Sequence, residues 1–264
     1  MAQAFFETIP MWAVYLLVVA FFLLACELGF HLGRLYRRWQ PDKEAVASVG
    51  PLVGGLLGMM AFMLGFAFSI ASNQHGTRRE NVLNEANIIG TAYLRADLLP
   101  PERGERVRRL LREYVDMRLA AVQPGADLQQ AMQGSGRIHQ QLWAEVSATA
   151  REQRDDISAL NVESINALID MHETRVTGGV RARIPSMVWL GLAGITFLTM
   201  LSVGLQLGLN GNRRQLAVGL LSLAFACMIT LIVDLNRPQG GLITVGQQAM
   251  LNLQQSMKGG PPGD

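Results

Sequence analysis

Four long apolar stretches alternate with polar segments along the chain. They cover Met11–Gly33, Val49–Ser72, Ser186–Leu209 and Leu216–Leu235. Each has about 20 residues with few charges, which is the length of α-helix that crosses a hydrocarbon layer roughly 30 Å thick. The pattern therefore predicts four transmembrane helices. The first is too long for the core of a signal peptide and no Lys or Arg precedes it, so we expect it to be retained.

The section between the second and third apolar stretches is polar, with acidic and basic side chains in equal number. Apolar residues recur in it at helical spacing, and arginines occupy the opposite face. The clearest stripe consists of Val107, Leu110, Leu111, Tyr114, Val115 and Leu119. Further helices are expected near 138–153 and 157–176, and "GSG" at 134–136 is interpreted as a linker. Because no proline occurs between Leu52 and Leu99, the second membrane helix is free to continue into this section.

These patterns predict an all-α integral membrane protein with a soluble helical domain inserted between spans two and three. The expected boundaries are 1–72 for the first two spans, 73–185 for the soluble domain, 186–237 for the last two spans, and 238–264 for a C-terminal segment with a disordered tail. The hydrophobic share of 50% agrees with this class. Basic residues gather in the two short loops, so the positive-inside rule favours cytoplasmic loops and a helical domain on the other side.

The residues that carry enzyme chemistry form no recognisable constellation. His31, His75, His139 and His172 are scattered without the spacing of metal ligands, and no phosphate loop or nucleophile elbow occurs. The formal net charge of +2 gives no argument for nucleic acid as a partner. Cys26 and Cys227 both lie inside predicted spans, where we expect them to be reduced and buried. We therefore expect neither an enzyme nor a cofactor or metal site.

The second span carries a regular row of residues at every fourth position. Gly50, Gly54 and Gly58 form the small-residue pattern that allows two membrane helices to approach closely. The row continues with Phe62, Phe66 and Ile70. Such a row could pack against neighbouring subunits and narrow a central pore with its bulky members. It could equally be ordinary helix packing, or face lipid.

Charged residues stand near the ends of the first and last spans. Glu27, His31 and Arg34 share one face of the first span, which suits either an interhelical pair or the wall of an ion path. Asp234 and Arg237 are three residues apart at the end of the last span, close enough to pair. Pro238 and the following glycines are expected to end that helix and turn the chain.

Three blocks in fixed order resemble the bestrophin-like domain family, a bacterial and plant group without assigned function. They are "RRENVLNEANIIGTAYLRADLLP", "RIPSMVW" and "VDLNRPQGGLITV". The family is named for a distant similarity to bestrophins, which are homopentameric anion channels with four spans per subunit. Their second helix lines the pore and forms an apolar neck, which Phe62, Phe66 and Ile70 resemble. The acidic calcium clasp of animal bestrophins has no counterpart, and bestrophins keep their helical domain in the cytoplasm, contrary to the charge bias of this chain.

The sequence thus supports two functions from different classes. The first is an oligomeric ion channel in the cell inner (plasma) membrane, for which the resemblance implies a pentamer and chloride or other monovalent anions. The second is a non-conducting membrane scaffold or sensor that binds a partner through its helical domain. The glycine and aromatic row favours the channel, whereas the large charge-balanced helical section favours the scaffold.

Overall fold

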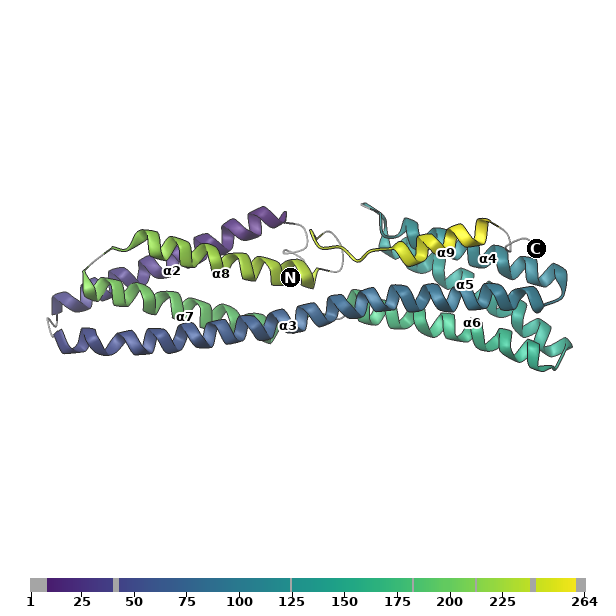
Figure 1. The fold of residues 1–264 in the computed structure, drawn as a ribbon, viewed down its shortest axis with the longest axis horizontal. Helices are drawn as coiled ribbons and strands as arrows, with labels where there is room; N and C mark the ends of the chain where they lie inside the picture. The colour runs from purple at the N-terminus through teal and green to yellow at the C-terminus, as the bar shows by residue number, and fades with distance from the viewer. Residues whose placement is uncertain are drawn as a thin grey trace. The chain divides into compact units, whose positions relative to one another are not determined.

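The structure is a computed structural model that describes residues 9–39, 43–123, 125–181, 183–211, 213–237 and 241–259. Within these residues it is helical and contains no strand (Figure 1). The α-helices are α2 (Met11–Trp39), α3 (Lys43–Arg95), α4 (Pro101–Ala120), α5 (Leu128–Glu152), α6 (Asp156–Arg175), α7 (Ser186–Asn210), α8 (Gln215–Asn236) and α9 (Gln248–Lys258). A short 3₁₀ helix, η1 (Ala96–Leu98), and a π-helical turn, η2 (Val176–Arg181), complete the set. The predicted all-α class is confirmed for these residues.

Four of the helices are long and apolar enough to cross a membrane. They are Met11–Trp39, Val49–Leu98, Ser186–Asn210 and Gln215–Asn236, each with a strongly apolar window and few charges. The four predicted apolar spans are therefore confirmed as helices of sufficient length. In the second case the helix continues without a break beyond the apolar part, as the absence of proline predicted. The α3 helix passes at Arg95 into η1, and η1 ends where Leu99, which precedes Pro100, is extended with φ −80° and ψ 163°.

The described chain divides into two compact units. Unit 1 comprises Met1–Gln74 and Arg183–Ile243, and unit 2 comprises His75–Ala182 and Thr244–Asp264. Each unit has its own apolar core. Unit 2 includes α9, which the sequence analysis did not predict. This helix belongs to unit 2 because its apolar residues Met250 and Met257 are buried in the core of that unit. The expected tail falls mostly on residues 260–264, outside the described residues.

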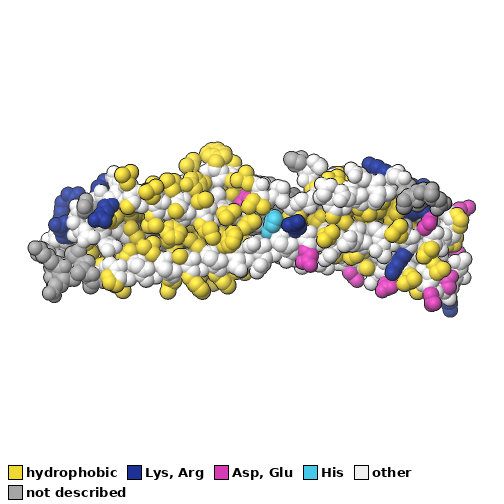
Figure 2. Space-filling view, in the orientation of Figure 1, with side chains coloured by type: hydrophobic (Ala, Val, Ile, Leu, Met, Phe, Trp, Pro, Cys, Tyr) yellow, Lys and Arg dark blue, Asp and Glu magenta, His cyan; other side chains and the backbone are white. Residues whose placement is uncertain are grey.

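In unit 1, α2 and α7 pack with their backbones almost in contact. A Cβ atom on Gly29 would lie 2.0 Å from the carbonyl oxygen of Leu201, and one on Gly204 would lie 1.9 Å from that of Cys26. Gly33 and Gly208 meet the opposite backbone in the same way. Four glycines thus remove the side chains that would keep these helices apart. The surface of this unit is rich in hydrophobic side chains, with Lys and Arg gathered at one end (Figure 2).

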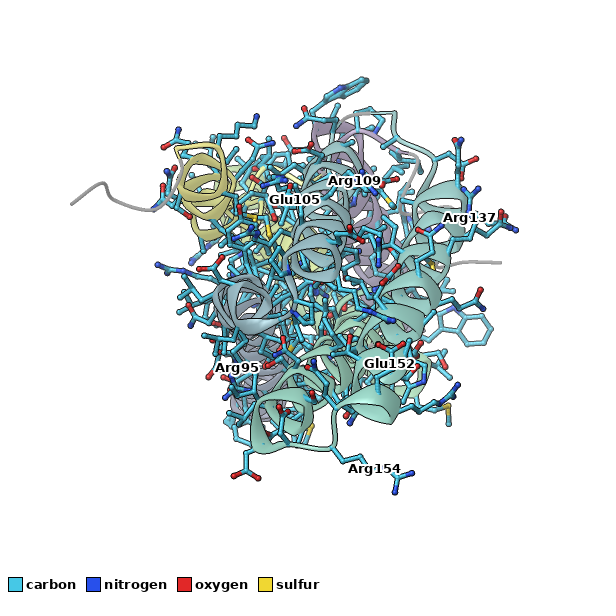
Figure 3. The ribbon with its side chains drawn as sticks, turned by 90° about the vertical axis from the view of Figure 1, so that its right-hand side faces the viewer. Arg95, Glu105, Arg109, Arg137, Glu152 and Arg154 are labelled. Carbon is cyan, nitrogen blue, oxygen red and sulfur yellow. The ribbon has the colours of Figure 1, made fainter. Side chains whose placement is uncertain are left out.

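In unit 2, the second half of α3 packs with α4, α5, α6 and α9 around a core that includes Ile89, Leu111 and Leu142. Local signals set the helix ends. Pro101 opens α4, and the side chains of Asp127 and Asp155 accept hydrogen bonds from the first free amides of α5 and α6. The side chain of Arg154 extends outward from this unit (Figure 3), whereas that of Arg95 donates hydrogen bonds to the Leu160 carbonyl and the Ser164 hydroxyl of α6.

The "GSG" segment is not a linker. Gly134, Ser135 and Gly136 lie inside α5, which begins at Leu128. The Ser135 hydroxyl donates to the Ala131 carbonyl at 2.9 Å, so its polar atom is satisfied within the helix. A Cβ on Gly134 would lie 2.7 Å from the sulfur of Met117, so the small residue allows α4 to approach α5. Tertiary packing outweighs the low helix propensity of glycine here.

Candidate functional site

The part of α3 in unit 1 has one buried face and one open apolar face. The buried face packs into the unit 1 core through Val53, Met60, Leu64, Ala67 and Ala71. On the opposite face Phe62 is 72% exposed and Phe66 is 51% exposed. A large aromatic side chain left open on a subunit indicates contact with lipid, with another copy, or with a pore.

The predicted row of every fourth residue does not stay on one face. Each step of four residues in an α-helix overshoots a full turn by about 40°, so the row sweeps through roughly 200° between positions 50 and 70. Phe62 and Phe66 fall in the middle of the open face. Ile70 has rotated to its border, where it is half-buried and packs against the unit 1 core. In the single subunit, Phe62 and Phe66 are therefore exposed and Ile70 is half-buried, and the neck of these three residues stays a prediction.

The same rotation affects the three glycines of the row. A Cβ on Gly50 would lie 3.2 Å from the side-chain nitrogen of Gln206, whereas Gly54 and Gly58 have no neighbour within 4 Å of that position among the described residues. Gly54 and Gly58 therefore make no close contact with the described part of the same chain. The close glycine packing of this chain occurs instead between α2 and α7. Its signal was present in the sequence as "GFHLG" and "GLQLG", which both have glycine at i and i+4.

The charged face of α2 pairs with the turn that precedes α8. Glu27 accepts a hydrogen bond from Arg213 at 2.6 Å, and its carboxylate lies 3.3 Å from the Nε2 atom of His31. The Arg213 guanidinium also lies over the Phe30 ring, 4.7 Å from its centroid. Arg34 is exposed farther along the same helix. The partner of Glu27 is thus Arg213, which lies between α7 and α8 and which sequence reasoning counted only as a loop charge.

At the end of α8, Asp234 and Arg237 hold different segments. The carboxylate of Asp234 accepts hydrogen bonds from the backbone amides of Leu242 and Ile243, at 2.7 and 2.8 Å. Arg237 donates from Nη2 to the carbonyl of Ile9 at 2.7 Å. Both residues are buried. Both side chains thus bind backbone groups of segments outside α8, and the pairing of the two charges stays a prediction.

The core of unit 2 contains a buried ionic cluster that the sequence did not reveal. Glu85 of α3 is fully buried and pairs with Arg175 of α6. Its other carboxylate oxygen accepts a hydrogen bond from Tyr114 of α4 at 2.7 Å and lies 3.4 Å from the Nε atom of Arg118. A buried carboxylate is tolerated only with such partners.

Two histidines extend this cluster. His172 of α6 lies with Nδ1 3.3 Å from the Tyr114 hydroxyl, and the ring of His139 of α5 packs edge-on against that of His172 at 4.9 Å. Burial lowers the pKa of His139 to about 4, and the neighbouring His172 and Arg118 add to this effect. Burial and Arg118 also lower the pKa of His172, and burial raises the pKa of Tyr114 to about 12. Both imidazoles are therefore neutral near pH 7.

These six residues were not singled out together from the sequence, because they come from four consecutive helices and lie up to 90 positions apart along the chain. Among the described residues, no group of three or more His, Cys, Asp or Glu side chains could hold a metal ion. The geometry is that of a buried ionic cluster that links α3, α4, α5 and α6, in which Nε of Arg118 and Nε2 of His139 have no hydrogen-bond partner among the described residues.

Comparison with known proteins identifies a family for the chain. No curated protein and no solved structure matches it. The Bestrophin-like domain family matches residues 19–250, from within α2 to the start of α9. This match and the four apolar helices agree with a multi-pass membrane protein. Since the match extends over nearly the whole length, the chain belongs to the Bestrophin-like domain family.

Proposed function

We propose that the protein assembles as a homo-oligomer around an ion-conducting pore lined by α3 of each subunit. The observation that carries this proposal is the open apolar face of α3, with Phe62 and Phe66 exposed and open space beside Gly54 and Gly58. Lipid contact alone does not require small residues, whereas a close helical neighbour does. Within the described chain that neighbour is not supplied by α2, α7 or α8.

In this assembly Phe62 and Phe66 form two stacked rings of apolar side chains. A narrow apolar constriction expels water, so an ion that enters must lose hydration, and the closed state is held without a charged gate. Ile70 contributes to the wall behind the neck, where it packs on the unit 1 core.

Membership of the family supports this proposal in its ion selectivity, its oligomer size and its location. Similarity to bestrophins favours chloride or other monovalent anions over cations, and a pentamer over other sizes. We place the four apolar helices in the cell inner membrane and unit 2, with α9, outside the hydrocarbon layer as the inserted helical domain. The charge-paired surface of unit 2 suits water, for example where Arg112 pairs with Glu105 at 2.6 Å and Arg106 with Glu145 at 3.0 Å.

Current measurement on purified protein in planar bilayers tests this function. We expect currents whose reversal potential follows the chloride gradient and does not move when Na⁺ is replaced by a large organic cation. A reversal potential that follows the cation gradient would show a cation pore. Silent bilayers, from protein that native mass spectrometry shows to be assembled, would instead identify a scaffold or sensor.

A further inference from the structure

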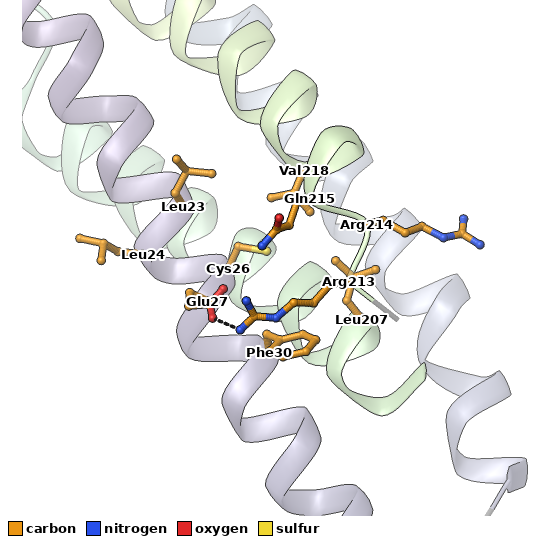
Figure 4. A pocket seen from close by; sticks show the side chains of 10 residues that line it. All are labelled: Leu23, Leu24, Cys26, Glu27, Phe30, Leu207, Arg213, Arg214, Gln215 and Val218. Atoms are coloured by element: carbon orange, nitrogen blue, oxygen red, sulfur yellow. Dashed lines mark hydrogen bonds and ion pairs between the residues drawn. The ribbon is translucent and has the colours of Figure 1, made fainter. Parts of the chain in front are cut away.

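The strongest unassigned feature is a pocket in unit 1, between α2, the end of α7 and the start of α8 (Figure 4). Its volume is about 370 Å³, within the range of sites that hold small ligands. Most of its wall is apolar and includes Leu24, Leu207 and Val218. One end is polar and is formed by Glu27, Arg213 and Arg214. The pocket thus combines an apolar wall with a charged end, as a site for an amphiphilic ligand would.

The polar end lies where the chain leaves the apolar helices. The α7 helix ends at Asn210 and α8 begins at Gln215, so Arg213 and Arg214 stand at the boundary between the apolar wall and water. Arg213 extends over Phe30 toward Glu27, and Arg214 points away from this pair (Figure 4). Glu27 neutralises one of the two guanidinium groups, so the polar end keeps a net positive charge.

Further arginines stand at the end of α2. Arg37 and Arg38 lie in the last turn of α2, and a Cβ on Gly211 would lie 1.9 Å from Nη1 of Arg37, so this guanidinium is held against the turn between α7 and α8. Among the described residues that line the pocket, Glu27 is the only one with an acidic side chain. A basic end of this kind attracts the anionic headgroups of a membrane leaflet.

We infer that the pocket binds one anionic phospholipid, with its phosphate on Arg213 and an acyl chain along Leu24, Leu207 and Val218, while Arg214 adds positive charge at the same end. The apolar wall would be filled by an acyl chain in a bilayer, because water gains few hydrogen bonds there. Arginine suits the phosphate because its guanidinium donates two parallel hydrogen bonds. A zwitterionic lipid is disfavoured because its cationic group would lie among arginines. Glu27 acts as a positioning residue that holds Arg213 across the pocket mouth.

Thermal unfolding of the full chain in detergent tests this inference, with phosphatidylglycerol or phosphatidylcholine added as the probe. A lipid that binds the folded state raises the midpoint in a concentration-dependent way. We expect phosphatidylglycerol to raise the midpoint more than phosphatidylcholine does. Arg213→Gln combined with Arg214→Gln should weaken this effect about tenfold in lipid concentration, as expected for loss of charge-assisted contacts. Arg38→Gln, at the same end but outside the pocket, is the matched control and should retain it.

A further variant separates the site from a structural ion pair. Val218→Trp leaves every charge in place but fills the apolar wall, so it should also weaken the phosphatidylglycerol effect. If Val218→Trp leaves the effect unchanged, or if Arg38→Gln weakens it as much as the double variant, the pocket is not the site. An equal response to inorganic phosphate would overturn the lipid assignment. These measurements do not depend on whether the protein conducts.

Discussion

The Tyr114 hydroxyl donates a 2.7 Å hydrogen bond to Glu85, a carboxylate that is fully buried between α3, α4 and α6. Two arginines compensate the same carboxylate, with Arg175 paired to one oxygen and Arg118 at 3.4 Å from the other. Because this cluster links helices that adjoin one another only in the folded state, its members report directly on the integrity of unit 2.

Replacing Glu85 should be among the most destabilising changes in unit 2. Glu85→Gln leaves two buried guanidinium groups without their counter-charge, a situation that costs about 3–5 kcal/mol. Tyr114→Phe removes one hydrogen bond to a charged group and should cost about 1.5–3 kcal/mol. The thermal unfolding midpoint of each variant in detergent provides the measurement. Glu105→Gln is the control, because Glu105 pairs with Arg112 and Arg108 on the exposed surface, where such pairs contribute about 1 kcal/mol or less. Equal midpoints for Glu85→Gln and Glu105→Gln would contradict the role of the cluster.

The neutral histidines make unit 2 sensitive to acid. The pKa of His139 is about 4 in the folded state and ordinarily about 6.5, so the unfolded chain binds more protons between these two values. The free energy of unfolding should therefore fall as the pH is lowered through this window, by as much as about 3 kcal/mol from His139, and the loss from this group should level off below it. The depressed pKa of His172 acts in the same direction.

His139→Phe separates this effect from the protonation of carboxylates, which wild type and variant share. The difference between the midpoints at pH 7 and pH 4.5 should shrink in this variant, because it has no imidazole to protonate beside His172, Arg118 and Tyr114. His31→Phe is the control, since His31 is exposed on α2. An unchanged pH dependence in His139→Phe would show that His139 is not the acid-sensitive group.

Glycine substitutions in unit 1 should have two different effects, on the stability of the subunit or on its assembly. Gly204→Ala places a methyl group 1.9 Å from the carbonyl oxygen of Cys26, so α2 and α7 must separate, and we expect a loss of about 1–3 kcal/mol in stability. Gly58→Ala meets no atom within 4 Å among the described residues and should leave the subunit folded. If α3 packs against a neighbouring copy, Gly54→Leu should lower the oligomer fraction in native mass spectrometry. A fully assembled Gly54→Leu protein would argue against that interface.

The end of α8 offers a test of how Asp234 acts. Asp234→Ala leaves the amides of Leu242 and Ile243 without their acceptor, and each unsatisfied group costs about 1–3 kcal/mol. Adding Arg237→Gln should not restore stability, because Arg237 bonds to the carbonyl of Ile9. Recovery of folded yield in the double variant would instead show that the two charges stabilise each other. Size-exclusion profiles of the purified variants give the comparison.

The open and packed members of the α3 row should respond differently to truncation. Phe62→Ala combined with Phe66→Ala removes the exposed rings, and the conductance or leak should rise while the protein stays folded, because a wider neck wets more easily. Ile70→Ala removes atoms that pack on the unit 1 core and should chiefly lower the unfolding midpoint. Unchanged ion flux in the double variant would remove the two phenylalanines from the pore.

Cysteine accessibility provides an independent reading of the same face. Cysteines that replace Phe62 and Phe66 should react with water-soluble thiol reagents in conducting protein. A cysteine in place of Leu64, which is 2% exposed, should stay protected and is the matched control. Protection at all three positions would place the phenylalanines in lipid or in a dry interface.

The apolar helices were determined by the sequence itself. Their length and hydropathy reflect a constraint that acts on each segment separately, since every backbone polar group in a hydrocarbon layer must be satisfied within its own helix. The continuation of α3 beyond Ser72 follows from local chemistry as well, because no proline interrupts it before Pro100. The helix starts at Asp127 and Asp155 are equally local, as each aspartate caps the helix that follows it.

Only the tertiary structure decided which residues meet. The row from Gly50 to Ile70 rotates around α3 as the helical period requires, but only the packing shows that Gly50 lies beside Gln206 and Ile70 against the unit 1 core. The partner of Glu27 proved to be Arg213, and the partners of Asp234 proved to be two amides, because loops bring these groups back to the helices. Four helices bring together Glu85, Tyr114, His139 and His172. The spacing of residues within any one of these helices does not predict that arrangement.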